Sequence, residues 1–259
     1  MENIVADEKQ TKLKKGKVYI ATTVSNNCFL GAEVCTNADE KALTKGYGTF
    51  STEAKNINSD YQPKSVNIDG WDATYNAFST LFPSITIIYC FLHGFIKIRD
   101  RCRKSPLFNK ICGRVWHVYQ AKNKKTFAQR IRRLKDWATT HLSPGGALTK
   151  INTLHEKSSL YQRAYDHPEA YRTSNMVDRL IRWFDRSLFT RQYFHGTLAS
   201  ANKAVRAWAL LRNYYPYCLR KIDEKNKFVC AASELNGFIY SSNWLENLIM
   251  ASSMNGYRQ

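Results

Sequence analysis

The chain has 259 residues, of which 44% are hydrophobic and 23% are charged. These proportions are globular, and they exclude a disordered tail, a collagen-like rod and a low-complexity scaffold. The 39 Lys and Arg residues outnumber the 21 Asp and Glu residues, and the resulting net charge of +18 favours a polyanionic partner, most commonly nucleic acid.

The seven cysteines follow no regular spacing, which is typical of reduced thiols in an intracellular protein. The first residues lack the basic and apolar segments of a signal peptide. The longest apolar run, Ile85 to Ile98, has 14 residues and is interrupted by His93 and Lys97. Because a membrane-spanning helix needs about 20 apolar residues, we expect no membrane partner and a cytoplasmic location, nucleoid-associated if the source is prokaryotic.

The first 90 residues contain short β-branched runs. In chain order we expect strands at 3–7, 17–24 and 28–35, a helix at 38–57, a strand at 64–70, a helix at 71–81 and a strand at 84–89. Asn26 and Asn27 tolerate positive φ, so the second and third strands are expected to form a hairpin.

From residue 91 the apolar spacing becomes helical. Helices are expected at 91–103, 115–141, 148–165, 175–189 and 199–214, followed by a short strand-like start at 228 and a helix at 244–254. The predicted organisation is a sheet region at 1–91, an all-helical insertion at 92–172, helices completing the core at 173–216 and a C-terminal tail at 217–259.

Most of the excess positive charge lies in one segment, which we call the basic segment. Lys97 to Lys135 contains 14 Lys and Arg residues and a single acid, Asp100. A solvated helix face usually carries both signs, so this segment is predicted to contact phosphates. The alternative is a basic surface without a partner. The predicted contacts are Arg99, Arg101, Arg103, Lys104, Lys122, Lys124, Lys125, Arg130, Arg132 and Arg133.

The predicted order of strands is that of an α/β fold with a ribonuclease-H-like mixed sheet, in which the first and fourth strands are parallel neighbours. Asp7 and Asp69 end those two strands, and adjacent strands lie about 4.8 Å apart. Two close carboxylates repel unless a cation neutralises them, and oxygen ligands suit Mg²⁺ or Mn²⁺. Alternatively, Asp69 caps the helix that begins at Trp71 and Asp7 only ends a strand.

A third carboxylate must come from a helix that packs on the sheet. Asp178 lies in the first turn of a predicted helix with Ser174 or Asn175 as its N-cap, where the helix dipole favours an anion. An acid at this position is also ordinary capping. Glu234 and Glu246 are the alternative third acids, and Glu246 also follows a segment that can begin a helix.

This ordered set of segments resembles the DDE/DDD transposases, in particular the Mutator-like group and related bacterial insertion-sequence enzymes. The matching segments are Ala6-Asp7, Val66 to Trp71, Leu81-Phe82-Pro83 followed by Cys90 and His93, and Thr173 to Arg182. The likeness covers about residues 3–216. It favours Asp178 as the third acid, with Asp in place of the Glu of that group.

The resemblance implies a transposase catalytic domain that cleaves phosphodiester bonds and transfers strands. It implies that Asp7, Asp69 and Asp178 hold two Mg²⁺ (or Mn²⁺) ions, that transposon ends and target DNA are the partners, and that a homodimer forms. Enzymes of this group usually carry an N-terminal DNA-binding region, so we expect a truncated chain. A catalytically inactive DNA-binding remnant and a ribonuclease-H-like nuclease or resolvase are the alternatives.

The resemblance also draws attention to Cys90 and His93, whose Cys-x-x-His spacing places them on one helical turn. His93 is expected to support the active site, by contacting a phosphate or Asp69, or to be a satisfied core histidine. The pair could also be half of a zinc site, completed by Cys102, Cys112 or His117, although no second paired motif supports zinc.

Overall fold

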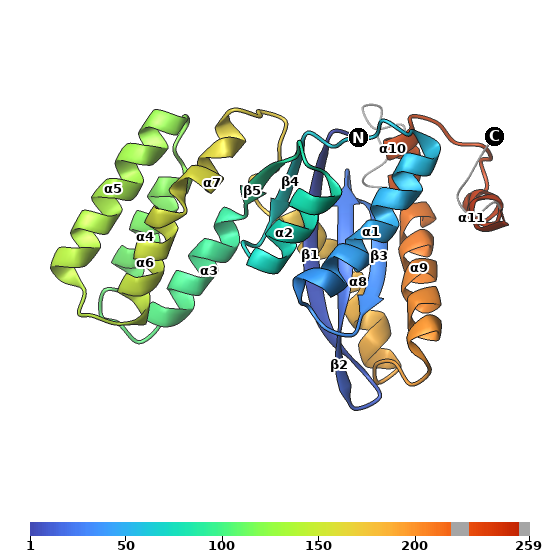
Figure 1. The fold of residues 1–259 in the computed structure, drawn as a ribbon, viewed down its shortest axis with the longest axis horizontal. Helices are drawn as coiled ribbons and strands as arrows, with labels where there is room; N and C mark the ends of the chain where they lie inside the picture. Colours follow the sequence, from blue (N-terminus) through green and yellow to red (C-terminus); the bar gives the residue numbers. More distant parts are fainter. Residues whose placement is uncertain (219–227, 254–259) are drawn as a thin grey trace.

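The computed structural model describes residues 1–218 and 228–253. Within these residues five strands form one sheet, in the order β3-β2-β1-β4-β5, shown in Figure 1. The strands are β1 (Asn3–Leu13), β2 (Gly16–Ser25), β3 (Cys28–Cys35), β4 (Ser65–Ile68) and β5 (Thr86–Tyr89).

The sheet is mixed. β1, β2 and β3 pair antiparallel, whereas β1, β4 and β5 pair parallel, so the first and fourth strands are parallel neighbours at the centre. Asn26 and Asn27 join β2 to β3 with φ of 47° and 60°, which confirms the expected hairpin. The predicted α/β class with a ribonuclease-H-like sheet is therefore confirmed by the strand order and directions.

The first strand is longer than predicted. β1 continues past Asp7 to Leu13, because residues 8–13 pair with β2 in unbroken antiparallel register from Glu8↔Ala21 to Leu13↔Gly16. The parallel pairing with β4 nevertheless stops at Val5↔Asn67. Asp7 consequently lies within a strand but just beyond the point where its parallel neighbour ends.

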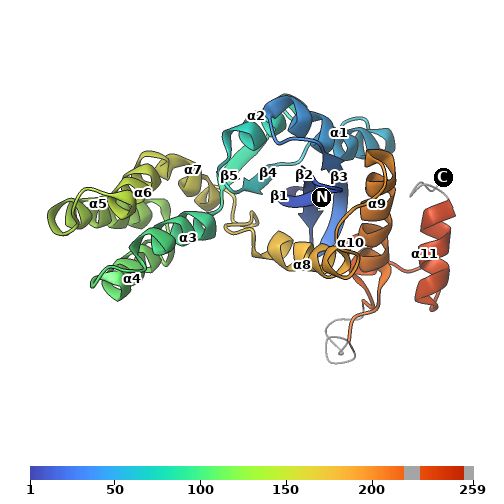
Figure 2. The ribbon, with the colours of Figure 1, turned by 90° about the horizontal axis from the view of Figure 1, so that it is seen from below.

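Helices cover both faces of the sheet, as Figure 2 shows. α1 (Glu40–Ile57) and α2 (Asp72–Leu81) pack on one face, where Ile4 and Ala6 join their core. α8 (Asn175–Thr190) and α9 (Leu198–Tyr214) pack on the other face, where Val5 joins theirs. Successive strand residues point to opposite faces, so β1 supplies side chains to both cores.

The remaining helices lie at the two ends of the molecule. A helical lobe extends from the β5 edge and has its own apolar core (Figures 1 and 2). It consists of α3 (Phe91–Cys102), α4 (Phe108–Tyr119), α5 (Lys124–His141), α6 (Gly146–Glu156), α7 (Ser158–Gln162) and η1 (Arg163–Tyr165). At the opposite end, α10 (Ala231–Asn236) and α11 (Trp244–Ser253) pack against α9.

Three further predicted elements differ from the structure. The single helix expected at 115–141 is two helices, because the side chain of Asn123 accepts the N–H of Thr126 (2.9 Å) and begins α5. The helix expected at 148–165 is divided into α6, α7 and η1. The described residues 228–230 form no strand, since Cys230 is the N-cap of α10. The rest of the predicted tail, at 219–227 and 254–259, lies outside the described residues.

Among residues 1–218 and 228–253, no helix combines the length and the apolar character needed to cross a bilayer.

Candidate metal centre

Three side chains from distant parts of the chain meet at one end of the parallel strand pair. Asp7 comes from β1, His93 from the first turn of α3 and Asp178 from the first turn of α8. One donor atom of each lies within 4.8 Å of one donor atom of each of the others, and all three residues are partly buried. Two oxygens and one imidazole nitrogen at this spacing could ligate a metal ion.

Asp69 borders this group without belonging to it. It follows β4 directly, and the β1–β4 register places it two residues beyond Asn67, as Asp7 is two residues beyond Val5. Its Oδ1 accepts the N–H of Trp71 at 2.9 Å, although the N-cap of α2 is Trp71 itself. The structure therefore brings Asp7 and Asp178 together and leaves Asp69 beside them, with one oxygen used in a turn.

A buried serine connects the histidine to the acid on α8. The Oγ of Ser174 lies 3.3 Å from Nδ1 of His93 and donates to Oδ2 of Asp178 at 3.4 Å. The backbone N–H of Ser174 also donates to Sγ of Cys90 at 3.2 Å. Cys90 and Ser174 are fully buried, so this network fixes the start of α8 against the start of α3. Cys90 contacts the site through Ser174 and His93.

The charges of the group are coupled. Burial raises the pKa of Asp7 to about 6; the His93 charge opposes this shift, and the charges of Asp69 and Asp178 add to it. Burial disfavours the His93 cation, but its hydrogen bond to Cys90 and the charges of Cys90, Asp7 and Asp69 raise its pKa to about 9. The imidazolium thus supplies positive charge between the carboxylates, and it must release a proton before its nitrogen can bind a metal ion.

The pKa of Cys90 is lowered: burial opposes its thiolate, but the hydrogen bond and the charge from His93 outweigh that effect. The thiol is therefore tied to the same charge network as the carboxylates.

Glu8, which follows Asp7 in β1, is a partly buried acid that the sequence did not single out. It points to the opposite face of the sheet from Asp7, where the hydroxyls of Tyr47 and Thr74 each donate to its Oε1 at 2.6 Å. Burial raises its pKa to about 7, against the effect of these hydrogen bonds. The only sequence signal was its position immediately after Asp7 in an alternating strand.

The donor set fits a divalent cation. Two carboxylates that face each other in a partly buried site need positive charge, and carboxylate oxygens suit Mg²⁺ or Mn²⁺. The group opens into a groove of about 690 Å³, which gives room for a substrate beside it. Its lining residues are Asp7, Glu8, Lys9, Leu92, His93, Ile96, Asn175, Asp178, Arg179, Ile181, Arg182 and Asp185.

Two sequence alternatives are not supported. Among the described residues, the group of potential metal ligands that contains His93 includes no cysteine. Burial and the neighbouring Cys112 also raise the pKa of Cys102 to about 11, which disfavours the thiolate that zinc needs. Glu246 lies on α11, exposed, and accepts a hydrogen bond from Ser241. Glu234 on α10 accepts one from Tyr217. Neither acid joins Asp7.

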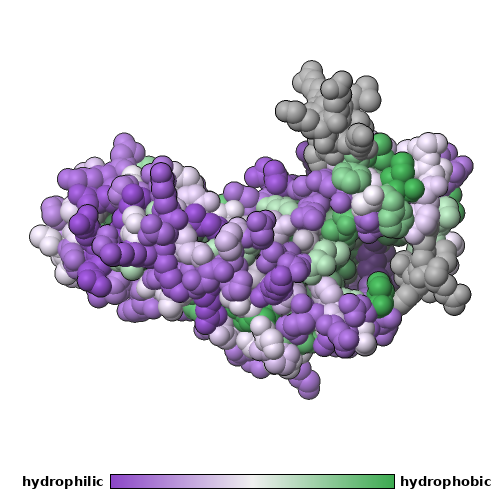
Figure 3. All heavy atoms as spheres, turned by 90° about the horizontal axis from the view of Figure 1, so that it is seen from above, coloured by the Kyte–Doolittle hydropathy of each residue, from purple (hydrophilic) through white to green (hydrophobic). Residues whose placement is uncertain are grey.

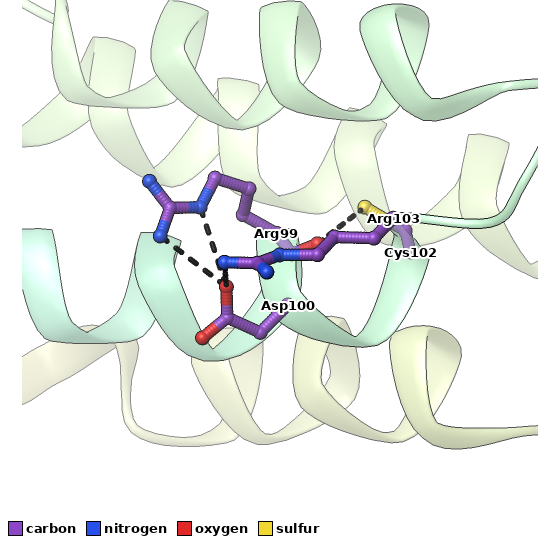
Figure 4. Close-up of polar contacts among 4 residues, drawn as sticks. All are labelled: Arg99, Asp100, Cys102 and Arg103. Atoms are coloured by element: carbon purple, nitrogen blue, oxygen red, sulfur yellow. Dashed lines mark hydrogen bonds and ion pairs between the residues drawn. The ribbon is translucent and has the colours of Figure 1, made fainter.

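The basic segment lies on the helical lobe, whose surface is largely hydrophilic in Figure 3. Asp100 binds both Arg99 (3.2 Å) and Arg103 (3.0 Å), as Figure 4 shows, and Lys124 pairs with Asp166 at 2.6 Å. Arg130 donates to a backbone carbonyl. The other predicted contacts are exposed and form no ion pair with the described residues: Arg101, Lys104, Lys122, Lys125, Arg132 and Arg133.

A smaller pocket of about 190 Å³ adjoins Asp69 on the side of the helical lobe. Lys97, Lys150 and Lys157 line it, together with the rings of Tyr89 and Tyr161. Basic side chains of the lobe therefore lie beside Asp69, the acid that follows β4. Lys150 and Lys157 lie beyond the basic segment, and no role was predicted for them from the sequence.

Comparisons with known proteins add little to this geometry. No family model matches the chain, and no curated protein matches it. Among solved structures, the HTLV-2 integrase catalytic core domain in complex with magnesium is similar in two forms. The trimeric form has 13% identity over 60% of this chain and 83% of that chain, with a TM-score of 0.27. The dimeric form has 14% identity over 47% and 88%, with a TM-score of 0.26. Similarity this weak supports no argument, so the fold assignment depends on the strand order and directions.

Proposed function

We propose that the chain is the catalytic domain of a DDE/DDD-type DNA transposase of the Mutator-like or insertion-sequence kind, which cleaves phosphodiester bonds and transfers strands. The supporting observation is the convergence of Asp7, His93 and Asp178, with Asp69 adjacent, at the end of two parallel strands. In this proposal the helical region 92–172 is an insertion into a core formed by residues 1–91 and 173–216.

Asp7, Asp69 and Asp178 are the residues that would hold Mg²⁺ or Mn²⁺. Bound divalent ions supply activation of a water or a 3′-hydroxyl and stabilisation of the leaving 3′-oxygen. Ser174 orients the carboxylate of Asp178 and the ring of His93 through its hydroxyl. The Oδ1 of Asp69 accepts the N–H of Trp71, so Asp69 would bind an ion through its Oδ2 or after this hydrogen bond breaks.

The positive side chains near the acids would position the DNA. Lys97, Lys150 and Lys157 line the pocket beside Asp69, where they can bind phosphates next to the scissile bond. The exposed basic residues of the helical lobe would bind duplex DNA further from the acids. A dimer is expected for an enzyme that joins two DNA ends, and the ion-binding acids all come from one chain.

Metal binding is the first test. We expect Asp7→Asn and Asp178→Asn to weaken Mn²⁺ binding, followed by electron paramagnetic resonance, by at least about ten-fold, equivalent to 1.4 kcal/mol. Glu246→Gln is the matched control, because it removes an exposed acid on α11 that is remote from Asp7. Equal Mn²⁺ affinity in all four proteins would contradict the proposal, provided that circular dichroism shows them folded.

Strand transfer is the second test. Labelled oligonucleotides copied from the DNA that flanks the coding sequence are incubated with supercoiled plasmid and Mn²⁺. Joining of label to plasmid, lost in Asp7→Asn, is the result expected of a transposase. Cutting without joining would indicate a nuclease or resolvase. DNA binding without either product would indicate the inactive remnant.

A further inference from the structure

A second positively charged surface lies on α8, outside the basic segment. Arg179, Arg182 and Arg186 follow one another at intervals of three and four residues, so they share one side of the helix and span about 10 Å along its axis. All three are exposed. Arg212 of α9 faces the same space. The four arginines form a cluster on the sheet face opposite α1 and α2.

Aromatic rings stand beside this cluster. Together they line a groove of about 610 Å³, which we call the arginine groove. The rings of Trp183 and Tyr215 lie 6.1 Å apart between centroids, and Trp244 continues the row at 5.8 Å from Tyr215. Tyr215 is 49% exposed, which is high for a large ring that has partners on two sides. About half of the residue is thus open to the solvent beside the groove.

The arginine groove is continuous with the metal centre. Arg179 and Arg182 line both the groove that contains Asp7 and Asp178 and the arginine groove. A flexible ligand with one end at the carboxylates can therefore follow the exposed side of α8 towards Tyr215. Duplex DNA is stiffer and wider than this path around one helix.

Within residues 1–218 and 228–253, none of the four arginines forms an ion pair with an acid. Asp185, on the same helix, binds Lys9 at 2.9 Å. Glu234 of α10 accepts the hydroxyl of Tyr217 at 2.6 Å. Asp178, which borders Arg179 and Arg182 in the metal groove, accepts a hydrogen bond from Ser174. Among the described residues these acids are engaged with other partners, so the arginines can bind anions.

We propose that the arginine groove binds single-stranded DNA that leads to or from the metal centre. Arginines would bind its phosphates, and Trp183 and Tyr215 would stack on its unpaired bases, the combination by which proteins bind single strands. The inference extends the proposed function, because it specifies an unpaired strand as the substrate beside the cleaved bond. Paired bases are already stacked within a duplex and offer no free face to these rings.

The test measures binding of a fluorescein-labelled 20-nucleotide single strand and of the matching duplex by anisotropy. The full chain is used in EDTA. We expect R182A/R186A to weaken single-strand binding by about ten-fold or more, and Tyr215→Ala by about five-fold or more, whereas Tyr215→Phe keeps the ring and binds like the wild type. Duplex binding should change less than two-fold.

The matched control is K41A/K45A, which removes two exposed positive charges from α1 on the other face of the sheet. Its single-strand affinity should remain within about two-fold of the wild type. If it falls as far as that of R182A/R186A, or if single strand and duplex lose affinity equally, the arginine groove is only part of a general basic surface and the inference is wrong.

This test is separate from that of the proposed function because it uses no metal. If Asp7→Asn abolishes Mn²⁺ binding while the groove variants bind single strands normally, only the inference fails. If the groove variants lose single-strand binding while Asp7→Asn binds Mn²⁺ like the wild type, the inference about the arginine groove stands. The proposed transposase chemistry is then wrong.

Discussion

At the scale of single residues, β1 places two adjacent acids in opposite environments. Asp7 faces α8 and lies beside His93 and Asp178. Glu8 faces α1 and α2, where its carboxyl group accepts hydrogen bonds from two hydroxyls. Alternation along a strand causes this division. One acid is therefore available for ion binding, and the other is part of the packing that fixes the strand.

The raised pKa of Glu8 makes the stability of the protein depend on pH. In the folded chain its pKa is about 7, against an ordinary value of 4.5. The folded state therefore holds this proton more tightly. The contribution of Glu8 to stability is fully present below pH 4.5 and is lost as pH rises through 7. Glu8→Gln keeps an Oε1 acceptor for Tyr47 and Thr74 but cannot ionise.

We expect the wild type to lose about 2–3 kcal/mol more of its unfolding free energy between pH 5 and pH 8 than Glu8→Gln does. Urea denaturation in EDTA at several pH values measures this difference. Asp7 titrates in both proteins, and the charge of its carboxylate adds to the shift of Glu8 only in the wild type. Parallel curves for the two proteins would show that Glu8 is not held in its neutral form.

The site was predictable from sequence only in part. The strand order predicted Asp7 and Asp69, and a helix start in a matching context predicted Asp178. The structure brings Asp7 and Asp178 together with His93 and leaves Asp69 beside this group. Glu8 did not stand out, because its burial depends on Tyr47 and Thr74, which approach from two other helices. Ser174 was expected only as an N-cap, although its side chain joins His93 to Asp178 and makes no cap bond.

At the scale of elements, apolar periodicity identified most strands and helices, and local chemistry decided their ends. The hydrophobic pattern of 115–141 continues through the break at Asn123, so a capping hydrogen bond rather than periodicity divides α4 from α5. Likewise, β1 extends past Asp7 because β2 provides backbone partners, which a short apolar run cannot reveal. Such contacts between distant segments limit prediction from a single sequence.

Gly46 and Gly113 lie inside helices whose packing against neighbouring residues differs. A Cβ at Gly46 of α1 would lie 2.5 Å from Sγ of Cys35 and 3.2 Å from Cβ of Ala21, so the helix touches the sheet there. A Cβ at Gly113 of α4 meets nothing within 4 Å. The same substitution should therefore have opposite effects at the two positions.

We expect Gly46→Ala to destabilise the protein by about 1–3 kcal/mol, because the added methyl group forces α1 away from β2 and β3. Gly113→Ala should stabilise α4 by about 0.5–1 kcal/mol, since alanine is the better helix former. Thermal and urea unfolding of both variants measure the effects. Equal effects in the two variants would mean that α1 does not pack as closely as the structure shows.

At the scale of the whole molecule, the candidate metal centre lies between two basic regions of different character. α3 is the first helix of the helical lobe and supplies His93. α8 covers one face of the sheet and supplies Asp178. The lobe offers dispersed Lys and Arg side chains, which suit a duplex backbone, whereas the arginine groove adds exposed rings. A strand leaving a bound duplex would thus reach the acids between the two regions.

The salt dependence of duplex binding tests the role assigned to the helical lobe. Each phosphate contact that is lost should reduce the slope of log affinity against log salt by about 0.9. Arg132 and Arg133 are exposed and form no ion pair with described residues, whereas Arg99 and Arg103 share Asp100. We therefore expect R132A/R133A to reduce the slope by up to about 1.8.

Its control, R99A/R103A, removes the same charge but should reduce the slope less, because these two side chains are already bound to Asp100 in the protein. Anisotropy titrations of a labelled 20-base-pair duplex between about 50 and 200 mM salt measure both slopes. An unchanged slope for R132A/R133A would show that Arg132 and Arg133 of α5 do not contact DNA phosphates. A larger loss for R99A/R103A would mean that DNA displaces Asp100 and that α3 is the principal contact.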